Sequence, residues 1–366
     1  MQASLFDTGL FRKGMDTAGG LVDRVFLSSL KAGRPFVTRI KKDPALYARQ
    51  VEWLVSRGYV DDPRSFFRLP DAAPVHAVVR ETRWRGGTRQ VISWDSGYEP
   101  RNPRVAEEYL GYENNRSAWM VRWTHGRPDT NTVLCLHGFM LGEPNQAEEM
   151  FKVARMFDMG LDVALYIAPF HWRRGTGASR DKAILLQPDN AVFTLEGFGQ
   201  SMWDLGSTMH VLRGLGAADI GLIGASLGGY NSALYSCLAR DHVFAAMMVP
   251  AVTFRGVFFP GEGDMPKGAS GELREQIRAV WDIPSPLGME PLLPPDRILV
   301  VASRGDRLCP FPHVAELCEK WGWPEHHFLA GGHWMMFDAS ARGRAWYSFL
   351  ERSGLVPEGE EGKPGG

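Results

Sequence analysis

Apolar and polar residues change their spacing along the chain, and these changes predict its secondary structure. Over residues 1–72, apolar side chains recur at helical spacing, for example within 21–27 and 45–58, which predicts helices with one buried face. From about residue 73 the period changes, and short apolar runs predict strands. Beyond residue 132, such runs alternate with helical stretches. Antiparallel strands followed by repeated strand–helix units indicate an α/β protein with a mostly parallel sheet and helices on both faces.

The expected strands and helices follow from this pattern. A hairpin is expected where residues 75–80 and 89–94 flank Gly86-Gly87, because paired glycines suit a tight turn. Further strands are expected at 118–123, 132–136, 163–168, 220–223, 244–249, 297–302 and 327–329. Later helices are expected near 197–215, 227–239, 271–281, 312–321 and 339–351.

The stretch from 251 to about 294 interrupts the alternation of strands and helices. It contains several prolines and glycines and one helical segment, and an insertion of this length between core strands is usually functional or disordered. We expect a cap over the carboxyl edge of the sheet. The chain is thus divided into a helical N-terminal extension (1–72), a main domain (73–356) that carries the cap, and a disordered acidic, glycine-rich tail (357–366).

Composition narrows the class of protein. A formal net charge of -1 argues against a broad basic face for nucleic acid, and no run reaches the roughly 18 uncharged apolar residues of a membrane span. Charged residues interrupt the first twenty positions, which predicts no secretory signal. The 4 cysteines are scattered, so neither a disulfide framework nor a zinc site is expected. We expect a cytoplasmic enzyme with no metal or other cofactor; the oligomeric state stays open.

One serine stands where a nucleophile would be placed. Ser226 lies in Gly-Ala-Ser-Leu-Gly-Gly, after an apolar run and before a helical one, which is typical of a nucleophile elbow. With 41 glycines in 366 residues, a Gly-x-Ser-x-Gly match arises by chance in about one such chain in four. The alternative is an ordinary glycine-rich turn, so the interpretation depends on the partners of the serine.

A serine hydroxyl needs a histidine base that a carboxylate orients, and later strand ends supply both. Asp306 follows the strand expected at 297–302, and His333 follows the last strand, after two glycines. A loop aspartate is more often a turn residue, and Glu262 and Asp264 are the alternative acids. Placement of all three at strand ends is nevertheless much less probable by chance than any single match.

Backbone N–H groups near the serine would complete such a site. Leu227 would donate one, assisted by the helix that it begins. The second is expected from the loop after the strand at 132–136, where Phe139 is the preferred donor and Met140 the next. His137, in the same loop, is expected to stabilise the loop.

From about residue 73 to 353 the chain resembles the α/β-hydrolase superfamily, within which it is similar to an uncharacterised branch with a long helical N-terminal extension. The resemblance rests on ordered motifs, namely His137-Gly138-Phe139, an Arg-Gly-x-Gly-x-Ser loop at 174–179, the segment 224–229, Gly305-Asp306 and Gly332-His333. It implies the α/β-hydrolase fold, with Ser226 as nucleophile, Asp306 as acid and His333 as base.

The expected function is serine-dependent hydrolysis of a small-molecule acyl ester, or thioester, through an acyl enzyme. The alternatives are a peptidase or amidase with the same triad, and a non-catalytic binding protein on this fold. Arg173 and Arg174 beside His171 suit recognition of a carboxylate or phosphate, with an internal salt bridge as the alternative. Phe258 is expected either to line an acyl pocket or only to pack the cap.

Overall fold

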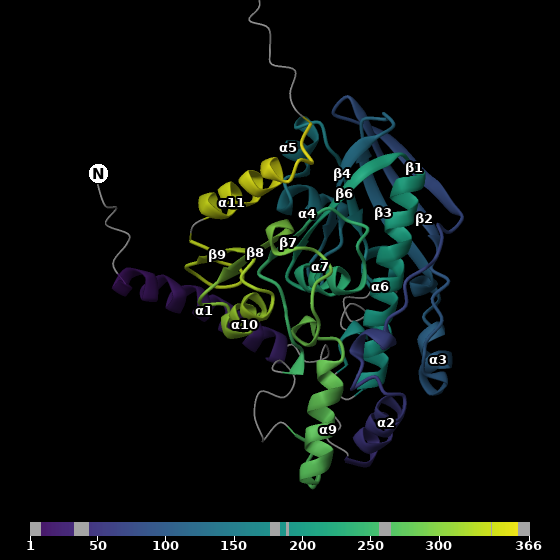
Figure 1. The fold of residues 1–366 in the computed structure, drawn as a ribbon, viewed down its shortest axis with the longest axis vertical. Coiled ribbons are helices and arrows are strands. Elements are labelled where there is room, and N and C mark those ends of the chain that lie inside the picture. The colour runs from purple at the N-terminus through teal and green to yellow at the C-terminus, as the bar shows by residue number, and fades with distance from the viewer. Residues whose placement is uncertain are drawn as a thin grey trace, which may run out of the picture.

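The sheet predicted from the sequence is present in the computed structural model, which describes residues 9–32, 44–175, 184–187, 190–255, 265–337 and 339–357. Within these residues, nine strands form one sheet in the order β1-β2-β3-β5-β4-β6-β7-β8-β9 (Figure 1). The strands are β1 (His76–Trp84), β2 (Gly87–Asp95), β3 (Ser117–Thr124), β4 (Thr130–Leu136), β5 (Asp162–Tyr166), β6 (Ala217–Ala225), β7 (Ala245–Met248), β8 (Ile298–Ser303) and β9 (Glu325–Leu329).

The first three strands are antiparallel, as is the pairing of β3 with β5. From β5 through β4 to β9 every neighbouring pair is parallel. The carboxyl ends of β4, β6, β8 and β9 therefore meet at one edge of the sheet, which is where open α/β sheets bind ligands.

Helices accompany the sheet on both faces. They are α1 (Gly9–Ala32), α2 (Pro44–Ser56), α3 (Pro103–Leu110), α4 (Pro144–Met150), α5 (Val153–Asp158), α6 (Ala191–Gly214), α7 (Leu227–Leu238), α9 (Gly271–Asp282), α10 (Phe311–Lys320) and α11 (Ala339–Arg352). Short 3-10 turns lie at η2 (Pro63–Phe66), η3 (Glu113–Arg116), η4 (Trp172–Arg174), η7 (Pro286–Gly288) and η8 (Pro295–Arg297).

Alternate residues of the central strands enter two separate apolar cores. In β4, Leu134 and Leu136 join the core under α2, α6, α7, α9 and α10, whereas Val133 and Cys135 join the core under α4, α5 and α11 (Figure 1). A strand buried on both faces reads as a continuous apolar run, so the sequence predicted these strands well.

The long helix α6 begins at Ala191, earlier than expected. Asn190 caps it, since its side chain accepts a hydrogen bond from Phe193 N at 3.1 Å. Glycines inside the helix interrupt the apolar pattern, so its first turns were not predicted from the sequence. The packing around the helix nevertheless requires these glycines. A Cβ on Gly199 would lie 2.3 Å from the Tyr98 hydroxyl oxygen, and one on Gly197 would lie 2.5 Å from Leu185 Cδ1.

The N-terminal helix α2 belongs to the main core. Tyr47, Val51 and Leu54 of α2 are buried in the same cluster as α6 and α7, and α2 packs against α9 (Figure 1). The division of the chain at residue 72 stays a prediction. Among the helices in the described part of the chain, none combines the length and apolar character that crossing a membrane requires.

Candidate active site

Ser226 occupies a sharp turn between β6 and α7. Its φ of 56° and ψ of -113° are unfavourable for a residue with a side chain, so the surroundings must hold it there. Ser226 N donates to Met248 O at 2.9 Å, and Ala251 N donates to Ser226 O at 3.2 Å. The turn is also tightly packed, because a Cβ on Gly228 would lie 1.8 Å from Leu136 O. This is the strand–turn–helix geometry of a nucleophile elbow.

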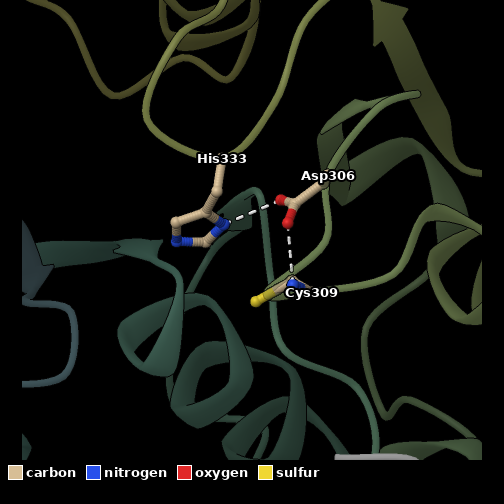
Figure 2. A group of neighbouring side chains, drawn as sticks. All are labelled: Asp306, Cys309 and His333. Atoms are coloured by element: carbon tan, nitrogen blue, oxygen red, sulfur yellow. Dashed lines mark hydrogen bonds and ion pairs between the residues drawn. The ribbon is translucent and has the colours of Figure 1, made fainter. Parts of the chain in front are cut away.

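The loops after β8 and β9 bring two further side chains to this serine. His333 Nε2 lies 3.1 Å from Ser226 Oγ, and His333 Nδ1 lies 2.7 Å from Asp306 Oδ2. The other oxygen of Asp306 accepts from Leu308 N at 2.9 Å and Cys309 N at 2.8 Å. Figure 2 shows the carboxylate between the imidazole and this backbone. An ionised Asp306 can only accept, so Nδ1 carries the proton and Nε2 is free to accept from the serine hydroxyl.

The environment of His333 favours its protonated form. Burial alone lowers the pKa of His333, but Cys309 and the hydrogen-bonded Asp306 outweigh that effect and hold the pKa well above its ordinary value. An imidazolium formed by proton transfer from Ser226 is therefore stabilised, and the hydrogen-bonded Asp306 carboxylate contributes to this whether or not the Cys309 thiol is ionised.

Cys309 lies beside the serine, with its Sγ 4.0 Å from Ser226 Oγ. Burial raises the pKa of the Cys309 thiol, and a protonated thiol is a poor nucleophile. The donor atoms of Asp306, Cys309 and His333 lie within 4.8 Å of one another, a grouping that could hold a metal ion. Both oxygens of Asp306 already accept hydrogen bonds, however, so hydrogen bonding accounts for the group.

The loop after β4 lies against the nucleophile, as the sequence predicts. A Cβ on Gly138 would be 3.5 Å from Ser226 Cβ. Among the described residues, neither Phe139 N nor Leu227 N has a hydrogen-bond acceptor. The amide of Met140 instead donates to His171 Nε2 at 3.1 Å. The amide of Met140, the second candidate donor to an oxyanion, is thus engaged with His171, whereas those of Phe139 and Leu227 stay the preferred candidates.

Two buried histidines shape this loop. His137 Nε2 accepts from Ala168 N at 3.1 Å, and its Nδ1 lies 2.8 Å from Gly138 O. His171 Nε2 accepts from Met140 N, and its Nδ1 lies 2.7 Å from Pro169 O. Since each Nε2 accepts from an amide, each Nδ1 carries the proton and donates to a carbonyl. The stabilising role expected for His137 agrees with these contacts. His171, predicted to bind substrate, is fully buried and contacts the same loop.

Arg174 is an internal anchor and does not face solvent. Its guanidinium donates to Ile167 O at 3.1 Å and pairs with Asp204 at 2.6 Å, and both side chains are fully buried. Burial raises the pKa of Asp204, and Arg174 is the charge that opposes the rise. Arg173 is exposed, with its guanidinium 4.9 Å from the ring centroids of both Trp119 and Trp172. Arg174 thus forms the internal salt bridge that was the alternative to recognition of an anionic substrate.

Replacing Arg174 with alanine should lower the free energy of unfolding by about 3–5 kcal/mol, because it leaves the Asp204 carboxylate buried without its partner. Urea unfolding monitored by tryptophan fluorescence measures this. Arg173→Ala is the matched control and should cost no more than about 1 kcal/mol, the value of an exposed cation–π contact. An Arg174→Ala protein of wild-type stability would contradict the anchoring role.

Some expected site residues lie outside the described part of the chain. These are Phe258, the alternative acids Glu262 and Asp264, and residues 176–179 of the Arg-Gly-x-Gly-x-Ser motif. Conversely, sequence reasoning gave α1 no role at the site, although Asp16 and Asp23 of that helix bind the loops of the acid and the base. Two acids in an amphipathic helix carry no signal for such a contact.

The sequence of the chain was compared with family models and with known proteins. No family model matches the chain. The uncharacterised proteins Rv2627c and MT2702 of Mycobacterium tuberculosis are each 27% identical over 343 residues, covering 91% of this chain and 81% of the relative.

Two solved structures are similar over most of the chain. The acetyl xylan esterase of Paenibacillus sp. R4 has a TM-score of 0.52 and 15% identity, covering 89% of this chain and 99% of that one. Acetyl xylan esterase 1 of Thermoanaerobacterium sp. JW/SL YS485 has a TM-score of 0.51 and 11% identity, covering 81% and 93%. With the parallel sheet and the elbow after β6, these similarities show that the chain has the α/β-hydrolase fold.

Proposed function

We propose that this protein is a serine hydrolase that cleaves a carboxylic ester or thioester through an acyl enzyme. The observation that carries the proposal is the continuous hydrogen-bonded chain from Ser226 through His333 to Asp306, with the serine at the apex of a strained turn. Such an arrangement activates a hydroxyl that is otherwise a weak nucleophile at neutral pH.

In the acylation step, Ser226 Oγ attacks the carbonyl carbon while His333 Nε2 takes the hydroxyl proton. Asp306 keeps the proton on Nδ1 and stabilises the imidazolium. The amides of Leu227 and Phe139 stabilise the negative charge that develops on the carbonyl oxygen. His333 then gives its proton to the leaving oxygen or sulfur, and the alcohol or thiol departs.

Deacylation repeats these roles with water. His333 Nε2 removes a proton from water, whose oxygen attacks the acyl carbon on Ser226. The intermediate collapses, Ser226 Oγ recovers the proton from His333, and the carboxylic acid leaves. The esterase names of the two similar structures favour an ester over an amide as the substrate bond.

The proposal includes residues 251–294 as a cap that begins at the nucleophile. Ala251 N donates to Ser226 O, and the Phe254 ring packs 4.9 Å from that of Tyr230 on α7. At the far side of the insertion, the Tyr230 hydroxyl donates to Pro284 O at 2.8 Å. Both ends are thus fixed to the helix that follows Ser226, which supports a wall of the acyl site here.

A fluorophosphonate probe tests the proposal directly. We expect stoichiometric labelling that peptide mass spectrometry maps to Ser226, with heat-unfolded protein as the unlabelled control. A folded protein that stays unlabelled at every probe chain length would favour the binding-protein alternative, and a label on Cys309 would contradict the assigned nucleophile.

Matched substrates then define the bond. Esters, thioesters and anilides of one acyl chain, compared over several chain lengths, should give the highest kcat/KM for an ester or thioester. Faster hydrolysis of the anilide would instead identify an amidase or peptidase. The rates should survive a chelator, because the proposed steps use only side chains and backbone amides.

A further inference from the structure

The N-terminal helix α1 lies against the two loops that carry the acid and the base. In Figure 1 it runs past the ends of β8 and β9. Asp23 of α1 is fully buried there. One of its oxygens, Oδ2, accepts from His333 N at 2.8 Å and from Arg307 N at 3.0 Å. A single carboxylate therefore joins the backbone of the base to the residue that follows Asp306.

The approach of α1 is close because the contact surfaces consist of glycine. A Cβ on Gly19 would lie 2.0 Å from Gly332 N, and one on Gly332 would lie 2.4 Å from Gly19 O. On the other loop, a Cβ on Gly305 would lie 2.2 Å from Asp16 O. The Asp16 side chain adds a second link, since its Oδ1 accepts from Gly331 N at 2.9 Å. Any side chain at these positions would hold the helix away and withdraw both carboxylates.

A buried carboxylate is costly unless it is well satisfied. In the described part of the chain, no Lys, Arg or His side chain pairs with Asp23, and its partners are backbone amides of the two loops alone. An uncharged acceptor would bind one amide at less cost. The Oδ2 atom connects both loops at once, and Oδ1 adds acceptors for His333 N and Trp334 N on the loop of the base.

We propose that Asp23 is a positioning residue of the active site, which sets the distance between Asp306 and His333 from a helix about 300 residues earlier in the chain. This inference rests on the proposed serine hydrolase function. The Asp306 Oδ2–His333 Nδ1 distance of 2.7 Å depends on where the two loops stand, because each side chain comes from its own loop. The segments just after β8 and β9 are also joined by the bond from Gly305 N to Gly331 O at 2.8 Å. Further along the two loops, Asp23 is the acceptor that Arg307 N and His333 N share. Misplacement of catalytic groups by about 1 Å can cost about 10²-fold in rate.

The test compares three full-length variants. Asp23→Ala removes the link and should lower kcat about 10- to 100-fold, with KM within about threefold of wild type, because the side chain does not touch the substrate. Asp23→Asn keeps one carbonyl acceptor, so its kcat should lie between those of the wild type and Asp23→Ala. Thr17→Ala is the control on the same helix and should match wild type, since the exposed Thr17 hydroxyl donates to Lys13 O within α1 and has no other hydrogen bond to the described residues.

A readout without substrate separates positioning from general stability. The proton on His333 Nδ1, held in the hydrogen bond to Asp306, should give a low-field proton resonance. In Asp23→Ala this resonance should move upfield or broaden well below the melting temperature, while tryptophan fluorescence shows a folded protein. If Asp23→Ala does not fold, Asp23→Asn carries the same test.

The outcomes for the two proposals are distinct. A wild-type protein that no fluorophosphonate labels would refute the hydrolase proposal. A labelled wild type whose Asp23 variants keep its kcat and its low-field resonance would overturn the positioning role alone. A fall in rate that only matches the fraction of unfolded protein would also overturn it, because Asp23 would then serve stability.

Discussion

Replacing Ser226 with alanine is expected to lower kcat toward an ester by a factor on the order of 10^6, because it removes the hydroxyl that forms the proposed acyl enzyme. Cys309 is the nearest substitute, 4.0 Å away, but burial raises the pKa of its thiol and keeps it protonated. Initial rates under saturating substrate, and labelling by a fluorophosphonate, measure the loss. Unfolding in urea should change by less than about 1 kcal/mol, since no fold contact of the Ser226 hydroxyl is lost.

Ser232→Ala is the matched control for this experiment. Ser232 lies on α7, the helix that Ser226 precedes, and its buried hydroxyl has no hydrogen-bond partner among the described residues. Its removal should leave both activity and stability at wild-type levels. Hydrolysis that persists in Ser226→Ala and disappears when Cys309 is alkylated would mean that the cysteine is the nucleophile.

Replacing Asp306 with asparagine should lower kcat about 10^4-fold while the protein stays folded. The backbone amides of Leu308 and Cys309 bind Oδ1 of the side chain and so select the carbonyl oxygen of an asparagine for that place. The NH₂ group then faces His333 Nδ1, which must become an acceptor. The proton moves to Nε2, which can no longer accept from Ser226.

The pH dependence of the same variant gives a second readout. His333 must be neutral to act as a base, and its pKa lies well above the ordinary 6.5. The acidic limb of the wild-type kcat/KM profile should therefore have its midpoint above pH 6.5, with activity rising as pH rises. Loss of the carboxylate removes one cause of the raised pKa of His333. The acidic limb of the Asp306→Asn profile should therefore have its midpoint at a lower pH than that of the wild type.

Asp296→Asn provides the comparison for Asp306. Asp296 is exposed and precedes β8, whereas Asp306 follows this strand, so the control makes the same chemical change at the opposite end of one strand. It should keep the wild-type rate and pH profile. A near-normal rate in Asp306→Asn would assign the acid to another carboxylate.

The strands and the hydrogen-bonded triad could be predicted because their signals are local. The central strands are buried on both faces and read as apolar runs. Ser226 directly follows β6, Asp306 lies in the loop after β8, and His333 lies in the loop after the edge strand β9. The short helices α3, α4 and α5 were not predicted. Each has fewer than nine residues, too few for a helical period to emerge.

From the sequence, His171 and Arg174 were expected at the substrate, whereas the structure buries both side chains among internal contacts. Polar residues that follow a strand can either bind a ligand or form structural contacts in the protein interior. The sequence does not distinguish these roles, because it does not show which residues are buried. The ion pair between Arg174 and Asp204 and the bond between His171 and Met140 join segments that the sequence does not show to be neighbours. The contact of Asp23 with His333 spans 310 positions, and no pattern within a single helix predicts it.

That separation has a consequence for the order in which the protein matures during synthesis. Asp23 leaves the ribosome long before its partner amide on His333 exists, and at about 5–20 residues per second the interval is roughly 15–60 s. In the meantime the glycine-lined side of α1 has no loops to dock on. Ser226 emerges in that same interval, without its base. A nascent chain therefore carries the Ser226 hydroxyl without its hydrogen-bond partner, and the contacts among Ser226, His333 and Asp306 form only after β9 has joined the sheet.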